Sequence, residues 1–118
     1  MTRFMTKRIV IQAIKECIDG IMAHCAANGK EGVHIFAWDP TVSSTTIPSK
    51  AVYYDSSHGV SDNWDGSNCK KIAQGKARVS QRLKMNSGDV PPELFNKDDC
   101  RFRGSVYNAV LGVSISGL

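Results

Sequence analysis

This sequence of 118 residues lacks the short motifs by which most catalytic and metal sites are recognised. It has no glycine-rich phosphate loop, no HExxH, no nucleophile elbow and no paired-carboxylate signature. Its four cysteines show no CxxC spacing, and no histidine pair has zinc-finger spacing, so a structural metal is not expected. We therefore expect a protein without catalysis of its own, although an enzyme stays open.

Long apolar runs are also missing. No segment approaches the roughly 20 apolar residues that span a bilayer. The basic start is followed by a stretch that Lys15, Glu16 and Asp19 interrupt, which is unlike the apolar region of a signal peptide. We expect no membrane association and a cytoplasmic protein. The cysteines there would be reduced thiols: Cys17, Cys25, Cys69 and Cys100.

Charge of one sign is not strongly in excess, because the net charge is only +4. That value is too small on its own to indicate a nucleic-acid partner, and we expect nucleic acid to be an unlikely one. Hydrophobic residues make up 42% of the chain and charged residues 22%, a balance typical of an ordered globular protein. The length predicts a single domain over residues 1–118.

The first half predicts a helix followed by a strand. A helix is expected from Lys7 to Asn28, with Thr6 as its N-cap, and Gly32 to Trp38 reads as a strand. Residues 41–50 are a loop or a poor edge strand, and residues 51–54 could pair back onto the first strand. The helix is indicated by an apolar stripe at three- and four-residue steps: Val10, Ile14, Cys17, Ile18, Ile21 and Cys25.

Residues 55–68 are rich in Ser, Gly, Asp and Asn, which predicts a loop. His58 and Trp64 lie in it, and a tryptophan in a polar loop indicates either a binding loop or a packed lid.

A second helix is predicted from Ser67 to Met85, with Ser67 as its N-cap. Its charged residues are all basic, which fits either a solvated face or a surface for an anion or acidic partner. Those residues are Lys70, Lys71, Lys76, Arg78, Arg82 and Lys84.

The end of the chain, residues 106–118, has no charged residue and is predicted to be a strand paired on both sides. From Leu111 on, large residues alternate with Gly112, Ser114 and Ser116, so the small face is expected beneath a helix. Gly104-Ser105 would form the hairpin turn before it. The fold class is therefore α+β: a largely antiparallel sheet of four or five strands with the two main helices on one face.

Three segments resemble one family. Residues 71–80, KIAQGKARVS, are similar to the helix segment IAxxKAxTA of GlcG-like and HbpS-like proteins, the haem-degrading family that includes PduO C-terminal-like domains. Residues 110–118 resemble that family's closing strand, xxGxIGVSG, and residues 33–39 its VVIAVVD strand. The resemblance implies the same order of elements and, as in some members, binding of haem or a corrinoid.

We therefore predict a small binding module of GlcG/HbpS type that takes a small, possibly haem-like ligand near a subunit interface. The alternative is an interaction or regulatory protein that uses the basic helix 67–85 to contact an acidic partner or nucleic acid. His24 and His34 could each ligate iron, although a lone histidine is more often structural. The candidate ligand-binding residues are His24, His58, Trp64, Lys76 and Arg103.

A homo-oligomer, at least a dimer, is also predicted. The strand from residue 32 to residue 38 carries bulk on both faces, and the expected helices cover one of them. Phe36 and Trp38 would then lie on an uncovered apolar face, which a second copy could bury. The alternative is that residues 41–68 fold over that face.

Overall fold

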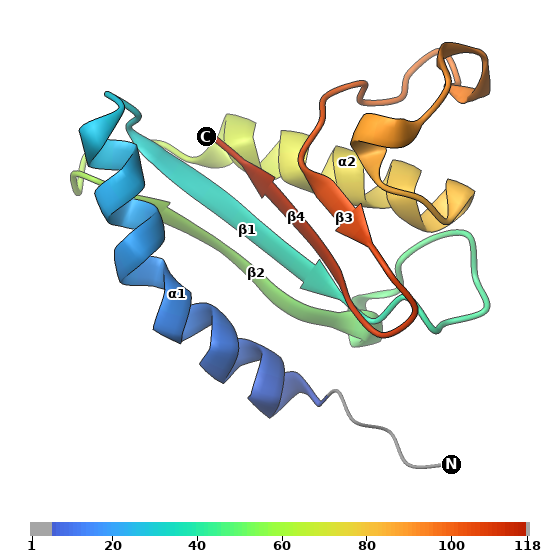
Figure 1. Cartoon of the computed structure of the whole chain (residues 1–118), viewed down its shortest axis with the longest axis horizontal. Coiled ribbons are helices and arrows are strands. Elements are labelled where there is room, and N and C mark those ends of the chain that lie inside the picture. Colours follow the sequence, from blue (N-terminus) through green and yellow to red (C-terminus); the bar gives the residue numbers. More distant parts are fainter. Residues whose placement is uncertain (1–5, 118) are drawn as a thin grey trace.

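The computed structural model describes residues 6–117 as one four-stranded sheet flanked by two long helices (Figure 1). The helices and strands are α1 (Lys7–Ala27), β1 (Gly32–Trp38), β2 (Val52–Gly59), α2 (Ser67–Leu83), β3 (Ser105–Tyr107) and β4 (Gly112–Ser116). Short 3-10 helices lie at Ser49–Ala51, Ser87–Asp89 and Pro92–Leu94.

The sheet has the strand order β2-β1-β4-β3, and every neighbouring pair is antiparallel. His34 in β1 lies opposite Ser57 in β2 and opposite Ser116 in β4. The predicted α+β class and antiparallel sheet are confirmed, with four strands. β4 is paired on both sides, as its sequence predicts.

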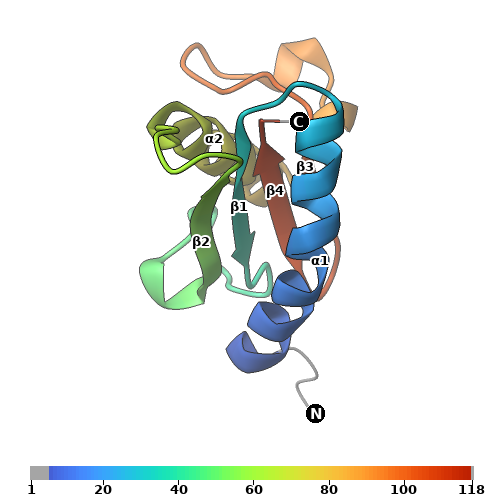
Figure 2. The same cartoon turned by 90° about the vertical axis from the view of Figure 1, so that its left-hand side faces the viewer.

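The two helices lie on opposite faces of the sheet, not on one face as predicted (Figure 2). Strand β1 carries large side chains on both faces, so each face needs a helix to cover it. Phe36 and Trp38 pack with Ala73 and Ala77 of α2. Val33 and Ile35 belong to the other face and pack with α1 through Cys25, Ile14, Ile21 and Met22.

This arrangement overturns the prediction that Phe36 and Trp38 lie on an uncovered face. Their exposed fractions are 6% and 0% beneath α2. Gly112, Ser114 and Ser116 face the same helix, as predicted, and the Ser114 hydroxyl donates to the carbonyl of Ala73 over 2.7 Å. Small residues on both elements let α2 approach the sheet closely.

Helix α1 begins where its cap predicts. The Thr6 side chain accepts a hydrogen bond from the N–H of Ile9 over 3.3 Å. The helix ends at Ala27 with Asn28 as its C-cap, and Gly29 follows with a φ of +67°, a left-handed conformation that favours glycine. Only Val10 and Cys25 of this helix are fully buried, so α1 lies on the sheet with most of its surface in solvent.

Strand β2 runs further than predicted, because residues 55–59 continue it where a loop was expected. An irregularity at Tyr53 shifts the register between Ala37 and Trp38. After this bulge Asp55 and Ser57 share the α2 face with His34, while Tyr54 and His58 face α1.

The C-terminal segment is a hairpin of two strands and not one long strand. Its turn lies at Asn108, whose side-chain oxygen accepts from the N–H groups of Val110 and Leu111, each over 2.9 Å. This local bonding turns the chain three residues later than Gly104-Ser105 predicts. Val110 consequently lies at the turn and is 47% exposed, where packing was expected.

The second helix also begins at a slightly different residue. Its N-cap is Gly66, and Ser67, the predicted cap, is the first helical residue. The Asp65 carboxylate accepts from the N–H of Ser67 over 3.0 Å. The Asp65 carboxylate, and not the predicted Ser67 hydroxyl, therefore makes the capping hydrogen bond.

Candidate functional site

A cavity of about 660 Å³ lies between the first half of α2, the end of β4 and the segment that precedes β3. Lys76 comes from α2, Arg103 from that segment, and Lys30 from the turn after α1. Its wall is largely apolar and includes Ile72, Phe102 and Ile115. Three cations therefore converge on an apolar hollow.

Lys76 is the unusual member of this set, because its exposed fraction is only 3%. Its ammonium donates to the carbonyl of Arg103 over 2.9 Å and to the carbonyl of Ile115. Within residues 6–117, no carboxylate lies at ion-pair distance from it. Burial lowers the pKa of Lys76, and the Cys100 and Cys69 thiols oppose this shift.

An ammonium has three N–H donors, and two of those of Lys76 are held by backbone carbonyls. A buried cation without a counter-ion is costly, so an anion in the cavity would offset that cost. Lys30 and Arg103 are exposed and add positive charge at the same cavity. The arrangement can hold an organic anion whose body is apolar.

The structure brings together two of the five predicted ligand-binding residues, Lys76 and Arg103. His24 lies exposed in the last turn of α1, where Asn28 donates to its carbonyl over 2.9 Å. The ring of Trp64 packs against the backbone of Gly32 and Gly59, in the manner of a packed lid.

The fifth predicted residue, His58, is on the α1 side of β2. Its Nε2 lies 2.7 Å from the hydroxyl of Tyr54, and the two rings are stacked. Burial lowers the pKa of His58, and the nearby His34 lowers it further. His58 therefore stays neutral to a lower pH than an ordinary histidine. None of the three histidines is among the residues that line the cavity.

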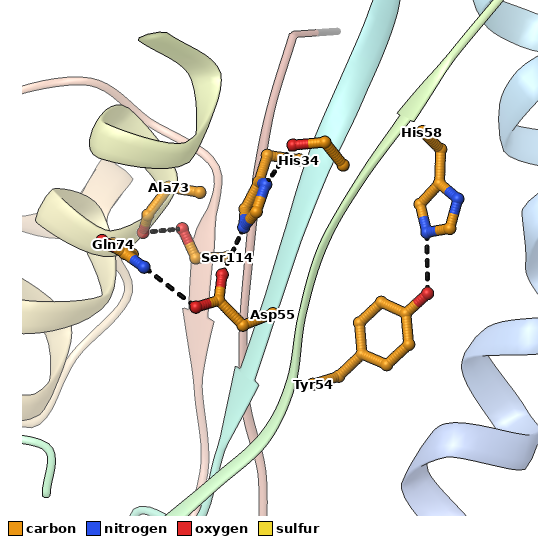
Figure 3. A network of polar contacts seen from close by, with 8 residues as sticks. His34, Tyr54, Asp55, His58, Ala73, Gln74 and Ser114 are labelled. Carbon is orange, nitrogen blue, oxygen red and sulfur yellow. Dashed lines mark hydrogen bonds and ion pairs between the residues drawn. The ribbon is translucent and has the colours of Figure 1, made fainter. Parts of the chain in front are cut away.

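A second polar cluster, which the sequence analysis did not predict, lies on the α2 face of the sheet (Figure 3). His34 Nδ1 is 2.6 Å from the hydroxyl oxygen of Ser57, and His34 Nε2 pairs with Asp55. Gln74 of α2 donates to the other oxygen of Asp55 over 3.0 Å. The alternation of Asp55 and Ser57 was the available signal, but it lies in a stretch whose composition predicts a loop.

The basic helix is less uniform than its sequence indicates. Lys70, Lys71 and Arg78 are exposed, but Lys76 points inward. Arg82 donates to both carboxylate oxygens of Asp99, over 2.9 and 2.6 Å. Contact of this helix with an acidic partner or nucleic acid stays a prediction.

No group of three or more His, Cys, Asp or Glu side chains within residues 6–117 is placed to hold a metal ion. None of the helices in this part of the chain has the length and hydropathy needed to cross a membrane. Comparison with protein-family models, curated proteins and solved structures finds no match to this chain.

Proposed function

We propose that this protein is a small-molecule binding module, and that its ligand is an organic anion with an apolar body held in the Lys76 cavity. The observation that carries the proposal is the buried ammonium of Lys76, which has no carboxylate partner within residues 6–117. Cations and apolar side chains line the same cavity, and this combination is typical of a site that binds a small molecule. Such a site needs no catalytic group.

A haem-like ligand, the one implied by the resemblance to GlcG-like and HbpS-like proteins, fits the same description. A porphyrin has an apolar ring and acidic side chains, which would meet the apolar wall and the cations of this cavity. Iron ligation by His24 or His58 is not part of the proposal, because neither lines the cavity. We assign the protein to that family as part of the proposal.

The probe for this site is 8-anilinonaphthalene-1-sulfonate, an apolar anion whose fluorescence rises on burial. We expect saturable binding that weakens about tenfold in Arg103→Ala and in Lys30→Ala, since each removes a cation from the cavity. Lys70→Ala, on the exposed surface of the same helix, is the matched control and should bind as the unaltered protein does. Hemin and iron-free protoporphyrin should each displace the probe.

Affinity should also depend on pH through Lys76. Because burial lowers the pKa of Lys76, its charge is lost as pH rises through a value below the roughly 10.4 of an ordinary lysine. Probe affinity should fall in that range, and Lys76→Arg should remove the fall. Equal binding by the Arg103, Lys30 and Lys70 variants would contradict the proposal.

We also propose a homo-oligomer in the cytoplasm, formed through the α1 side of β3 and β4. Val106 is 55% exposed there, and Leu111, Val113 and Ile115 are partly exposed. A groove of about 220 Å³ between α1 and β4 continues this surface and has only apolar lining residues. An uncharged strip of this kind suits a second copy of itself.

The four free thiols support the cytoplasm as the compartment.

A further inference from the structure

The cluster of Ser57, His34 and Asp55 has the connectivity of a nucleophile, a base and a group that orients the base. The Ser57 hydroxyl oxygen lies 2.6 Å from His34 Nδ1, and His34 Nε2 is paired with Asp55. A carboxylate only accepts hydrogen bonds, so Asp55 fixes the proton of a neutral His34 on Nε2. Nδ1 is then the unprotonated nitrogen that accepts the hydrogen bond of the serine hydroxyl.

The three groups are held from several sides. His34 is 2% exposed in the central strand, and its cross-strand partner is Ser57 itself. Gln74 reaches from α2 to the second oxygen of Asp55, which limits rotation of the carboxylate (Figure 3). Ser57 and Asp55 are exposed residues of the edge strand, while the base His34 is buried.

The positive end of α2 lies beside the hydroxyl. A Cβ added to Gly66, the N-cap, would come within 2.6 Å of Ser57 Oγ, so glycine is required for this close approach. Helix α2 has 17 residues; the N–H of Ser67 already donates to Asp65, and the N–H groups of Asn68 and Cys69 have no acceptor within the helix. Such N–H groups, together with the helix dipole, stabilise negative charge that develops next to them.

We propose that Ser57 is the nucleophile of an esterase-type site, with His34 as general base and Asp55 as its positioning residue. Ser57 Oγ bonds to the acyl carbon of an activated ester while its proton passes to His34 Nδ1. The ester C–O bond then breaks, and the leaving alcohol takes that proton. Water attacks the acyl-serine, gives a proton to His34, and the carboxylic acid leaves as Ser57 regains its proton.

The test is covalent labelling with an alkyl fluorophosphonate, which forms an Oγ–P bond to an activated serine and releases fluoride. Intact-mass and peptide spectra should place one label on Ser57. Ser57→Ala should abolish it. Ser56→Ala is the matched control, because Ser56 pairs with Ile35 and is the neighbouring serine of the same strand. That variant should label at the unaltered rate.

The role of Asp55 is tested by the rate of labelling and its dependence on pH. Asp55→Asn should slow labelling by roughly 100-fold or more and shift the midpoint of the pH–rate profile, because the base loses its charged partner. Asp55→Glu should restore part of the rate. Circular dichroism should show that both variants are folded. If Asp55 only supports the fold, the pH–rate profile of these folded variants should equal that of the unaltered protein.

Two results would overturn the proposal: no labelling of the unaltered protein under conditions in which a known serine hydrolase reacts fully, or undiminished labelling of Ser57→Ala. The site is independent of the Lys76 cavity, whose lining residues do not include Ser57. Ser57→Ala should therefore bind the anionic dye normally, so failure here is distinguishable from failure of the binding proposal.

Discussion

Gly112 illustrates how one residue without a side chain fixes the position of a large one. The indole of Trp38 lies directly on it, and the atoms nearest to a Cβ built there are all atoms of that ring. The ring cannot withdraw easily, because its Nε1 donates to Gln81 of α2 over 2.8 Å and Trp38 is fully buried. Glycine at position 112 therefore allows α2, Trp38 and β4 to pack together.

We expect Gly112→Ala to lower the free energy of unfolding by about 1–3 kcal/mol, the usual cost of overpacking a core. Gly20→Ala is the control, since nothing lies within 4 Å of a Cβ at that position of α1. It should be neutral or stabilising, by up to about 1 kcal/mol, because alanine favours a helix. Urea unfolding of both variants measures the difference, and equal stabilities would contradict the overpacking argument.

At this scale the sequence predicts some residues better than others. Lys76 and Arg103 share a cavity, but Lys76 was expected on a basic surface and is buried. Composition alone cannot show which lysine of a helix faces inward. The cluster of His34, Asp55 and Ser57 depends on the cross-strand register, which forms only once β2 pairs with β1.

Among the elements, α2 is joined at its C-terminal end to the irregular segment that follows it. Arg82 binds both oxygens of Asp99, and Asp99 also accepts from the N–H of Asn96 over 2.6 Å. The side-chain hydrogen bond from Arg82 is the main reason why the pKa of Asp99 lies below its usual value. This ion pair holds residues 94–99 against the helix.

The contribution of Asp99 to stability should depend on pH. Since its pKa is lowered by folding, the contribution is present above the unfolded value, about 3.9, and is lost as pH falls through the lower folded value. At pH 7 Asp99→Asn should cost about 1 kcal/mol, and well below that window it should cost nothing. Urea unfolding at both pH values measures this.

The control for that prediction is Asp98→Asn. Asp98 is exposed and has no ion pair with any residue between 6 and 117. Its substitution should leave the free energy of unfolding unchanged at either pH. A pH-independent loss in Asp99→Asn would indicate that packing, and not the charge, matters at this position.

Helices and strands in which apolar residues recur at a regular spacing could be predicted from the sequence. Elements that depend on hydrogen bonds of local side chains could not. Periodicity was sufficient for α1 and β1, whose bounds agree with the sequence prediction within one residue. The far half of β2 is polar and glycine-containing, and only its pairing with β1 makes it a strand. The last turn depends on the side chain of Asn108, a signal that the apolar residues around it obscured.

For the whole molecule, the central feature is an asymmetry between the two sheet faces. α2 buries seven of its residues, whereas α1 buries two and lies beside β1 and β2, away from β3 (Figure 1). The α1 side of β3 and β4 is therefore the exposed apolar surface on which we place the oligomer contact. Phe36 and Trp38, the residues predicted for it, are enclosed beneath α2.

Val106→Glu should dissociate the oligomer while each chain stays folded, because Val106 is already 55% exposed within its own chain. Val60→Glu is the matched control, since Val60 is 50% exposed and lies beyond the end of β2, outside this surface. Sedimentation equilibrium should give a dimer or larger species for the unaltered protein and for Val60→Glu. A single-chain mass for the unaltered protein at tens of micromolar would refute the oligomer.

The pairing of β1 with β4 has a consequence for synthesis on the ribosome. Residues 32–38 emerge early, but their partners at residues 112–116 are among the last of this sequence to be made. Until then β1 can pair only with β2, and its other edge presents free backbone groups beside side chains that are all buried in the finished fold. Such an edge readily pairs with foreign chains. We therefore expect the nascent chain to present an aggregation-prone edge that β4 covers in the folded protein.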